Sequence, residues 1–200
     1  MKRTNEQKGI SDMNRKTTRV LVIVLCLVLA MTLFTGCGRN YASEAKKLNR
    51  GSYGLRIAGG PEGSEEAALA NALATILKNG GYGATVLTTE GAEDNVDRTR
   101  TYKADLAIVS SNALKDAGDG LYMLMALGTA SDGSRNVILC SDDTMPQMAW
   151  DMLSLIASSL DALEAASDGS EITMAEGNTD LPVTLNEGAA AYFKKQPWKK

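Results

Sequence analysis

The sequence of 200 residues contains no histidine. This absence excludes Ser-His-Asp and Cys-His catalysis, HExxH metal sites and every other metal centre that uses a histidine ligand. The chain also lacks a basic excess, because 21 Lys and Arg stand against 24 Asp and Glu. An acidic pI near 5.1 argues against a general nucleic-acid binder. With 44% hydrophobic and 22% charged residues, the composition is that of a globular protein.

The amino-terminal segment has the pattern of an export signal. Residues 1–19 are polar and basic, and residues 20–34 form a charge-free apolar run. A basic region, followed by an apolar run and then by small residues at a cleavage site, is typical of a secretory signal. The run is shorter than the ~20 residues that cross a bilayer comfortably. A retained anchor helix stays open as the alternative.

Residues 33–37 (LFTGC) resemble the lipobox of bacterial lipoproteins, although Phe34 stands where leucine is usual. The resemblance implies cleavage after Gly36 and lipidation of Cys37. The lipid anchor would hold the protein in the membrane, on the extracytoplasmic face of the bacterial cell membrane. A lipoprotein cysteine carries at least two acyl chains, which are enough for stable anchoring.

The three cysteines agree with this interpretation. Cys26 lies in the apolar run and leaves with the signal, while Cys37 is lipidated. Cys140 then remains alone, so an intramolecular disulfide is not available. We expect Cys140 to be a small buried residue on a strand and not a nucleophile.

The pattern divides the chain into three parts: a lipoprotein signal peptide (1–36), a flexible tether (37–52) and a folded domain (53–200). Residues 37–200 hold 15 basic and 22 acidic residues, a net charge of −7. An acidic body of this kind is not attracted to an anionic membrane by its net charge, so the anchor has to hold it there.

Apolar periodicity predicts an α/β fold. Strands and helices alternate with short connections, which is typical of a mostly parallel sheet flanked by helices. The predicted strands are 55–58, 84–88, 105–109, 121–127 and 136–140, and the predicted helices follow Ser64 to about residue 79 and span 92–103, 146–166 and 187–195.

A glycine-rich loop (59–63) joins the first strand to the first helix. It lacks the GxGxxG spacing and the GK[ST] ending of nucleotide loops. The carboxylates of Glu62, Glu65 and Glu66 would repel phosphate. We therefore expect a small-molecule pocket at the carboxyl ends of the strands, where open α/β sheets usually bind ligands. A tight turn that only starts a helix is the alternative.

Five segments in the same order resemble TAXI-type solute-binding proteins of TRAP transporters. They are residues 55–77 (LRIAGGPEGSEEAALANALATIL), 86–95 (VLTTEGAEDN), 102–114 (YKADLAIVSSNAL), 142–146 (DDTMP) and 181–193 (LPVTLNEGAAAYF). The resemblance implies a periplasmic-binding-protein-like lobe. It also implies a small polar solute, such as an amino acid or related metabolite, and a membrane permease or sensor as partner. The implied ligand contacts are Gly59, Gly60, Gly63, Ser64, Thr89, Glu90, Asn95, Ser110 and Ser111.

The chain departs from the family in three ways. Residues 53–200 are too few for two lobes, so the resemblance is to a shortened, single-lobe form. Glu65 and Glu66 replace a tyrosine pair, and residues 186–188 (NEG) replace the family's HPG. Glutamates at the loop favour a cationic or neutral ligand. An alternative function is a ligand-free interaction or sensory accessory module that docks on a membrane partner or self-associates.

We do not expect an enzyme. The adjacent acidic pairs Asp142-Asp143 and Glu65-Glu66 could supply acid–base chemistry, but neighbours on a helix do not face each other. The loop aspartates lack the spacing of a calcium-binding loop. The sequence therefore predicts no catalytic residues, no metal site and no cofactor.

Overall fold

The computed structural model describes residues 40–115, 117–129, 133–167, 172 and 181–195. Residues 41–200 form one compact unit, which is the subject below. The predicted signal peptide and Cys37 lie outside the described residues. In the part of the chain that the structure describes, no helix combines the length and apolar character needed to cross a membrane.

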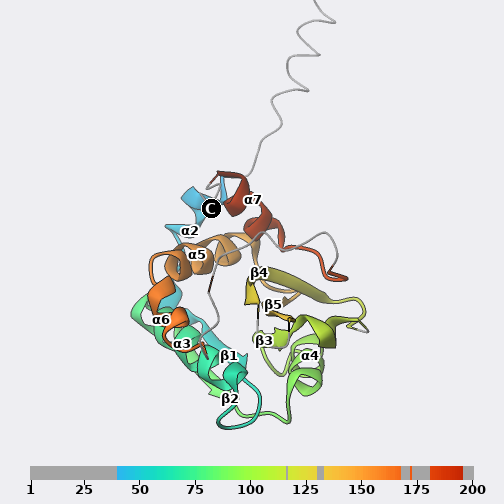
Figure 1. The fold of residues 1–200 in the computed structure, drawn as a ribbon. Coiled ribbons are helices and arrows are strands. Elements are labelled where there is room, and N and C mark those ends of the chain that lie inside the picture. The colour runs from blue at the N-terminus through green and yellow to red at the C-terminus, as the bar shows by residue number, and fades with distance from the viewer. Residues whose placement is uncertain (1–39, 116, 130–132, 168–171, 173–180, 196–200) are drawn as a thin grey trace, which may run out of the picture. The chain divides into compact units, whose positions relative to one another are not determined.

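The core of the fold is one five-stranded sheet with the order β2-β1-β3-β5-β4 (Figure 1). β1 pairs in parallel with β2 and β3, whereas β5 pairs antiparallel with β3 and β4. The strands are β1 (Gly54–Ala58), β2 (Gly83–Leu87), β3 (Leu106–Ser110), β4 (Leu121–Thr129) and β5 (Arg135–Ser141).

The α/β class is confirmed, but the sheet is mixed and not mostly parallel. The prediction is wrong at β4 and β5. Only a short connection separates Thr129 from Arg135, and a parallel crossover needs a dozen or more residues. These two strands therefore pair as a hairpin, in which β5 lies antiparallel to β3 and β4 forms the edge of the sheet.

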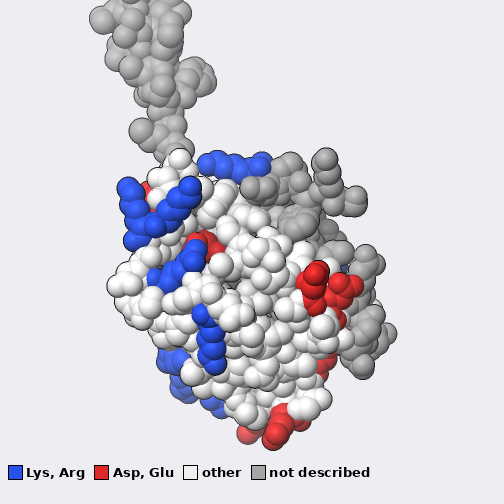
Figure 2. All heavy atoms as spheres, turned by 90° about the vertical axis from the view of Figure 1, so that its left-hand side faces the viewer, with Lys and Arg blue, Asp and Glu red and all other residues white. Residues whose placement is uncertain are grey.

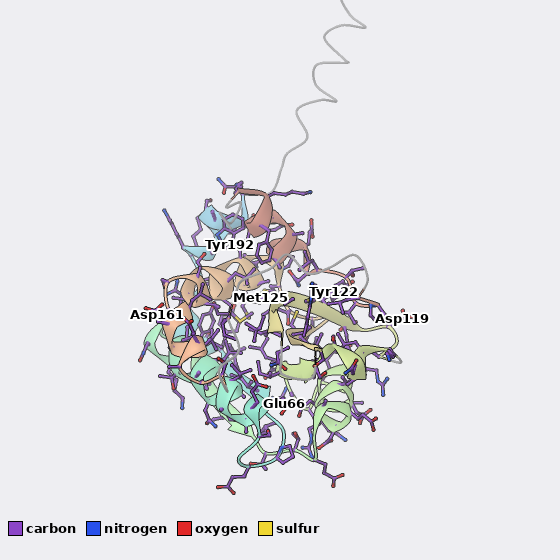
Figure 3. All side chains as sticks on the ribbon, in the orientation of Figure 1. Glu66, Asp119, Tyr122, Met125, Asp161 and Tyr192 are labelled. Carbon is purple, nitrogen blue, oxygen red and sulfur yellow. The ribbon has the colours of Figure 1, made fainter. Side chains whose placement is uncertain are left out.

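Helices cover both faces of the sheet. α3 (Glu65–Asn79) and α5 (Pro146–Ala157) enclose the larger core, while α4 (Ala92–Arg100) and the short 3₁₀ helix η2 (Ser111–Leu114) enclose the smaller one. Along β3, Leu106 and Ile108 enter the larger core, whereas alternate residues enter the smaller one. Met125 of β4 is fully buried in the larger core, while Asp119 lies exposed before that strand (Figure 3).

The helix predicted after Ser64 is α3, and it starts where the sequence predicts. The Ser64 hydroxyl accepts a hydrogen bond from the backbone N–H of Ala67 at 3.1 Å, and Glu65 and Glu66 occupy the first turn of α3. This is a side-chain cap with favourable negative charge at the amino end of the helix.

The long helix predicted over 146–166 is in fact two helices, α5 and α6 (Leu160–Glu164). The break falls at Ser158 and Ser159. The Ser158 hydroxyl donates to the carbonyl of Leu155 at 2.8 Å. Serine side chains that bind nearby carbonyls compete with the helical hydrogen-bond ladder, which explains why an apolar stripe did not keep the helix continuous.

The predicted tether is wrong from Tyr41 onward. A short helix, α2 (Tyr41–Ala45), is followed by a 3₁₀ turn, η1 (Arg50–Ser52). Tyr41 is only 3% exposed and belongs to the larger core. A five-residue helix is too short to display periodicity, so its burial depends on contact with α5, about 100 residues away in the sequence.

A carboxy-terminal segment protects one edge of the sheet. Met123 of β4 donates its N–H to Thr184 at 2.8 Å and accepts from Asn186 at 2.9 Å. The Asn186 amide also donates to the Thr144 carbonyl at 3.0 Å and accepts the Gly188 N–H at 2.9 Å. Asn186 therefore starts α7 (Glu187–Lys195) against the body.

Candidate functional site

The carboxyl ends of β1, β2 and β3 meet at one edge of the sheet, because these three strands are parallel. A hollow of about 580 Å³ lies at this edge, between the loop after β2 and the loop after β3. Its lining residues are Glu90, Gly91, Ala92, Glu93, Asp94, Ser110, Asn112 and Ala113. Of the nine predicted ligand contacts, Glu90 and Ser110 line the hollow.

The hollow is acidic. Glu90 and Glu93 are exposed, and Asp94 accepts a hydrogen bond from the Glu90 N–H at 3.0 Å. That backbone hydrogen bond lowers the pKa of Asp94, and the guanidinium of Arg98, 2.9 Å away, lowers it further against a partial opposing effect of burial. Asp94 thus remains ionised at neutral pH. Carboxylates lining one depression raise the local concentration of cations.

A series of buried hydrogen bonds connects the loops after β1 and β2 to α4 and to β3. The Gly60 N–H donates to the Thr89 hydroxyl at 2.8 Å, and that hydroxyl donates to the Asn95 side-chain carbonyl. The Asn95 amide donates to the Ile108 carbonyl of β3 at 2.8 Å. Asn95 has no exposed surface and Thr89 is 6% exposed. These two predicted ligand contacts therefore position the loops of the site.

We expect Asn95→Ala to lower the free energy of unfolding by about 2–3 kcal/mol, because it leaves the Ile108 carbonyl and the Thr89 hydroxyl buried without this partner. Urea denaturation measures the loss. The matched control is Asn71→Ala on the exposed surface of α3, where the change should stay within about 0.5 kcal/mol. Equal effects of the two substitutions would contradict the positioning role of Asn95.

The predicted glycines have structural roles. A Cβ on Gly59 would come within 2.8 Å of the Ala70 side chain, so glycine permits the close approach of β1 to α3. Gly60 and Gly63 have φ values of +80° and +85°, the left-handed region that favours glycine. None of the three lines the hollow.

The two remaining predicted contacts are serines. The Ser64 side chain caps α3, and the Ser111 hydroxyl accepts the Arg135 N–H at 3.0 Å. Neither residue is among those that line the hollow. Both serines thus hold backbone in place at the ends of elements.

The sequence reasoning missed most of the lining, including Glu93, Asp94 and Asn112. The first two fall within the helix predicted over 92–103. A usable signal was present, because a glycine followed by acidic residues directly after a strand places carboxylates at the carboxyl edge of the sheet.

One buried amide lies beside the hollow without a partner. Asn136 of β5 is 3% exposed, and its side-chain NH₂ makes no hydrogen bond to any described residue. In the antiparallel register Asn136 lies directly opposite Ser110, which lines the hollow. Opposed residues on neighbouring strands have Cβ atoms about 5 Å apart on the same face. The amide is thus a hydrogen-bond donor next to the site.

Other reactive groups are occupied or buried. The Tyr102 hydroxyl donates to Asp142 at 2.7 Å, and this hydrogen bond raises the pKa of Tyr102. Burial raises the pKa of the Cys140 thiol to about 12, so it stays protonated on β5 as expected for a structural residue. Across the described ranges, no group of three or more acidic or cysteine side chains is placed to hold a metal ion.

No protein-family model matches the chain, and no curated protein matches it in sequence.

Proposed function

We propose that the protein is a lipid-anchored, extracytoplasmic solute-binding protein of TAXI type, reduced to one lobe and non-catalytic. The observation that carries the proposal is the hollow at the carboxyl edge of the parallel strands β1, β2 and β3. Open α/β sheets bind ligands in this place, and a volume of about 580 Å³ lies in the range of small-molecule sites. Its partner in the membrane would be a permease or a sensor.

The chemistry of the lining favours a solute with an ammonium group. Glu90 and Glu93 present exposed carboxylates to the hollow, while Ser110 and Asn112 present polar groups on the opposite side. An amino acid or a related amine fits both the carboxylates on one side of the hollow and the polar groups on the other. One lobe leaves such a solute partly exposed, so we expect weak binding.

A thermal-shift panel of amino acids, polyamines and C4-dicarboxylates on the full chain tests this proposal. Amine-bearing solutes should raise the melting temperature, and dicarboxylates should not. A ligand at about 100 times its Kd adds about 2.7 kcal/mol of stability.

The double variant Glu90→Gln, Glu93→Gln should abolish the shift, because it removes the carboxylates that face the ammonium. The control Glu164→Gln removes an exposed carboxylate of α6 and should preserve the shift. No shift at millimolar solute, or a shift that survives the double variant, would count against the proposal.

A second function, a ligand-free interaction or sensory module, is favoured by one observation. Gly60, Thr89 and Asn95 are bonded to one another, so this part of the predicted ligand site is closed. Such a module would dock on a membrane partner or self-associate. Light scattering that gives a dimer, together with no solute shift, would favour this function, whereas a monomer with a solute shift would exclude it.

A further inference from the structure

The folded body begins close to the proposed anchor. α2 starts at Tyr41, four residues after Cys37, and an extended chain of that length spans at most about 14 Å. Because Tyr41 and Ala45 are buried in the core, α2 moves with the body. Lipidation of Cys37, which is part of the proposed function, would therefore hold the α2 end of the body against the membrane.

A set of cations surrounds this end, which we name the basic surface. α5 packs against both α2 and α7, so the ends of these two helices belong to one side of the body. Arg50 donates to the Gly80 carbonyl at 2.8 Å, which joins the end of α3 to the same side. Figure 2 shows Lys and Arg gathered mainly over the upper and left parts of this face. The basic surface consists of Lys46, Lys47, Lys78, Lys194 and Lys195.

The acidic hollow lies at the other end of the parallel strands. β1 leaves η1 and Arg50 at its amino end and reaches Gly59 at its carboxyl end. Glu62, Glu90 and Glu93 follow the carboxyl ends of β1 and β2 and are exposed. The net charge of −7 over residues 37–200 thus conceals a local positive surface next to the anchor.

We propose that the basic surface binds the headgroups of anionic phospholipids and turns the hollow away from the membrane. Lysines near an anionic membrane are attracted to it over about a Debye length. The four-residue connection keeps the start of α2 within about 14 Å of a lipidated Cys37. Acyl chains combined with a basic patch are a recurrent pair of membrane signals. Although the net charge of the body predicts no attraction, its distribution supplies one.

Lysine acylation with mass-spectrometric readout tests the orientation. The full chain is purified from bacterial membranes in detergent and reconstituted on two kinds of vesicles. One kind is pure phosphatidylcholine, and in the other about one lipid in three is phosphatidylglycerol. Acylation of Lys46, Lys47 and Lys194 should fall on the anionic vesicles, while Lys115, which follows η2 beside the hollow, should react equally on both. The proposal would be overturned if each of the four lysines were acylated to the same extent on both kinds of vesicles.

Charge reversal supplies the matched control. Lys46→Glu, Lys47→Glu should reduce the protection of Lys194 on anionic vesicles by about 5-fold or more, because it repels the headgroups. Lys115→Glu introduces a negative charge at an exposed site next to the hollow and should leave that protection unchanged. If the Lys46→Glu, Lys47→Glu variant and the Lys115→Glu variant show the same protection of Lys194 on anionic vesicles, the basic surface has no orienting role.

The same spectra separate this proposal from the anchor. The mass of the amino-terminal peptide reports whether Cys37 carries lipid. A lipidated Cys37 with unprotected lysines would overturn the basic surface and leave the anchor. An unmodified Cys37 with protected lysines would overturn the anchor and support the basic surface.

Discussion

Replacing Gly188 with alanine is expected to lower the free energy of unfolding by about 3 kcal/mol or more. A Cβ at this position in the first turn of α7 would lie 1.7 Å from the Pro146 carbonyl oxygen and 2.5 Å from its carbonyl carbon. Both are backbone atoms at the start of α5, so no side chain can rotate to make room. α7 would have to move away from α5 and strain the Asn186 bond to the Thr144 carbonyl. Urea denaturation measures the loss.

The control for this prediction is Gly54→Ala at the start of β1. An added Cβ there meets no atom within 4 Å, and Gly54 is not among the residues with positive φ. Its effect should lie within about 1 kcal/mol in either direction. If Gly188→Ala proved no more destabilising than Gly54→Ala, the tight contact between the two helices would be refuted.

Asp151→Ala is the second substitution with a large expected effect, about 3 kcal/mol of lost stability. Asp151 is 4% exposed and accepts two hydrogen bonds from the Arg50 guanidinium and one from the Tyr82 hydroxyl, all at 2.7 Å. The hydrogen bond to Asp151 raises the pKa of Arg50, and burial followed by the same carboxylate raises the pKa of Tyr82. Without Asp151, the Tyr82 hydroxyl is buried and loses this acceptor.

The lower stability of the Asp151→Ala variant should be accompanied by faster amide hydrogen exchange in residues 41–52, because the Arg50–Asp151 bridge holds this segment on α5. Asp97→Ala removes a carboxylate from the exposed pair with Arg100 and should cost at most about 0.5 kcal/mol. Unchanged exchange in residues 41–52 of the Asp151 variant would show that the bridge does not retain the segment.

The bridge also bears on the proposed orientation at the membrane. It joins η1, which follows the proposed anchor in the sequence, to α5 through a pair of charges 101 residues apart. In the proposed orientation the segment 41–52 would therefore stay attached to the body at the membrane. The basic surface and the acidic hollow would lie at opposite ends of the parallel strands, with the proposed solute site directed away from the lipid.

Part of the candidate site was predictable because its signals are local. Glycines after β1, a serine cap at Ser64 and a strand that ends at Ser110 place loops at the carboxyl edge without any knowledge of the rest of the chain. Which side chains line the hollow depends on how α4 packs on the sheet. That packing buries Asn95 on the inner side of the helix and leaves Glu93 exposed at the hollow.

The strands, the main helices and the α/β class could be predicted from the sequence, because apolar periodicity, helix caps and glycines that end helices are signals between near neighbours in the chain. The folded structure was needed to show the antiparallel pairing of β5 with β3, the packing of α2 on α5 and the location of basic and acidic residues at opposite ends of the parallel strands. These features depend on pairings between distant segments, such as Arg50 with Asp151 and Gly188 with Pro146. The absence of histidine excluded whole classes of chemistry at the outset, whereas the local excess of lysine near the proposed anchor became visible only in the folded chain.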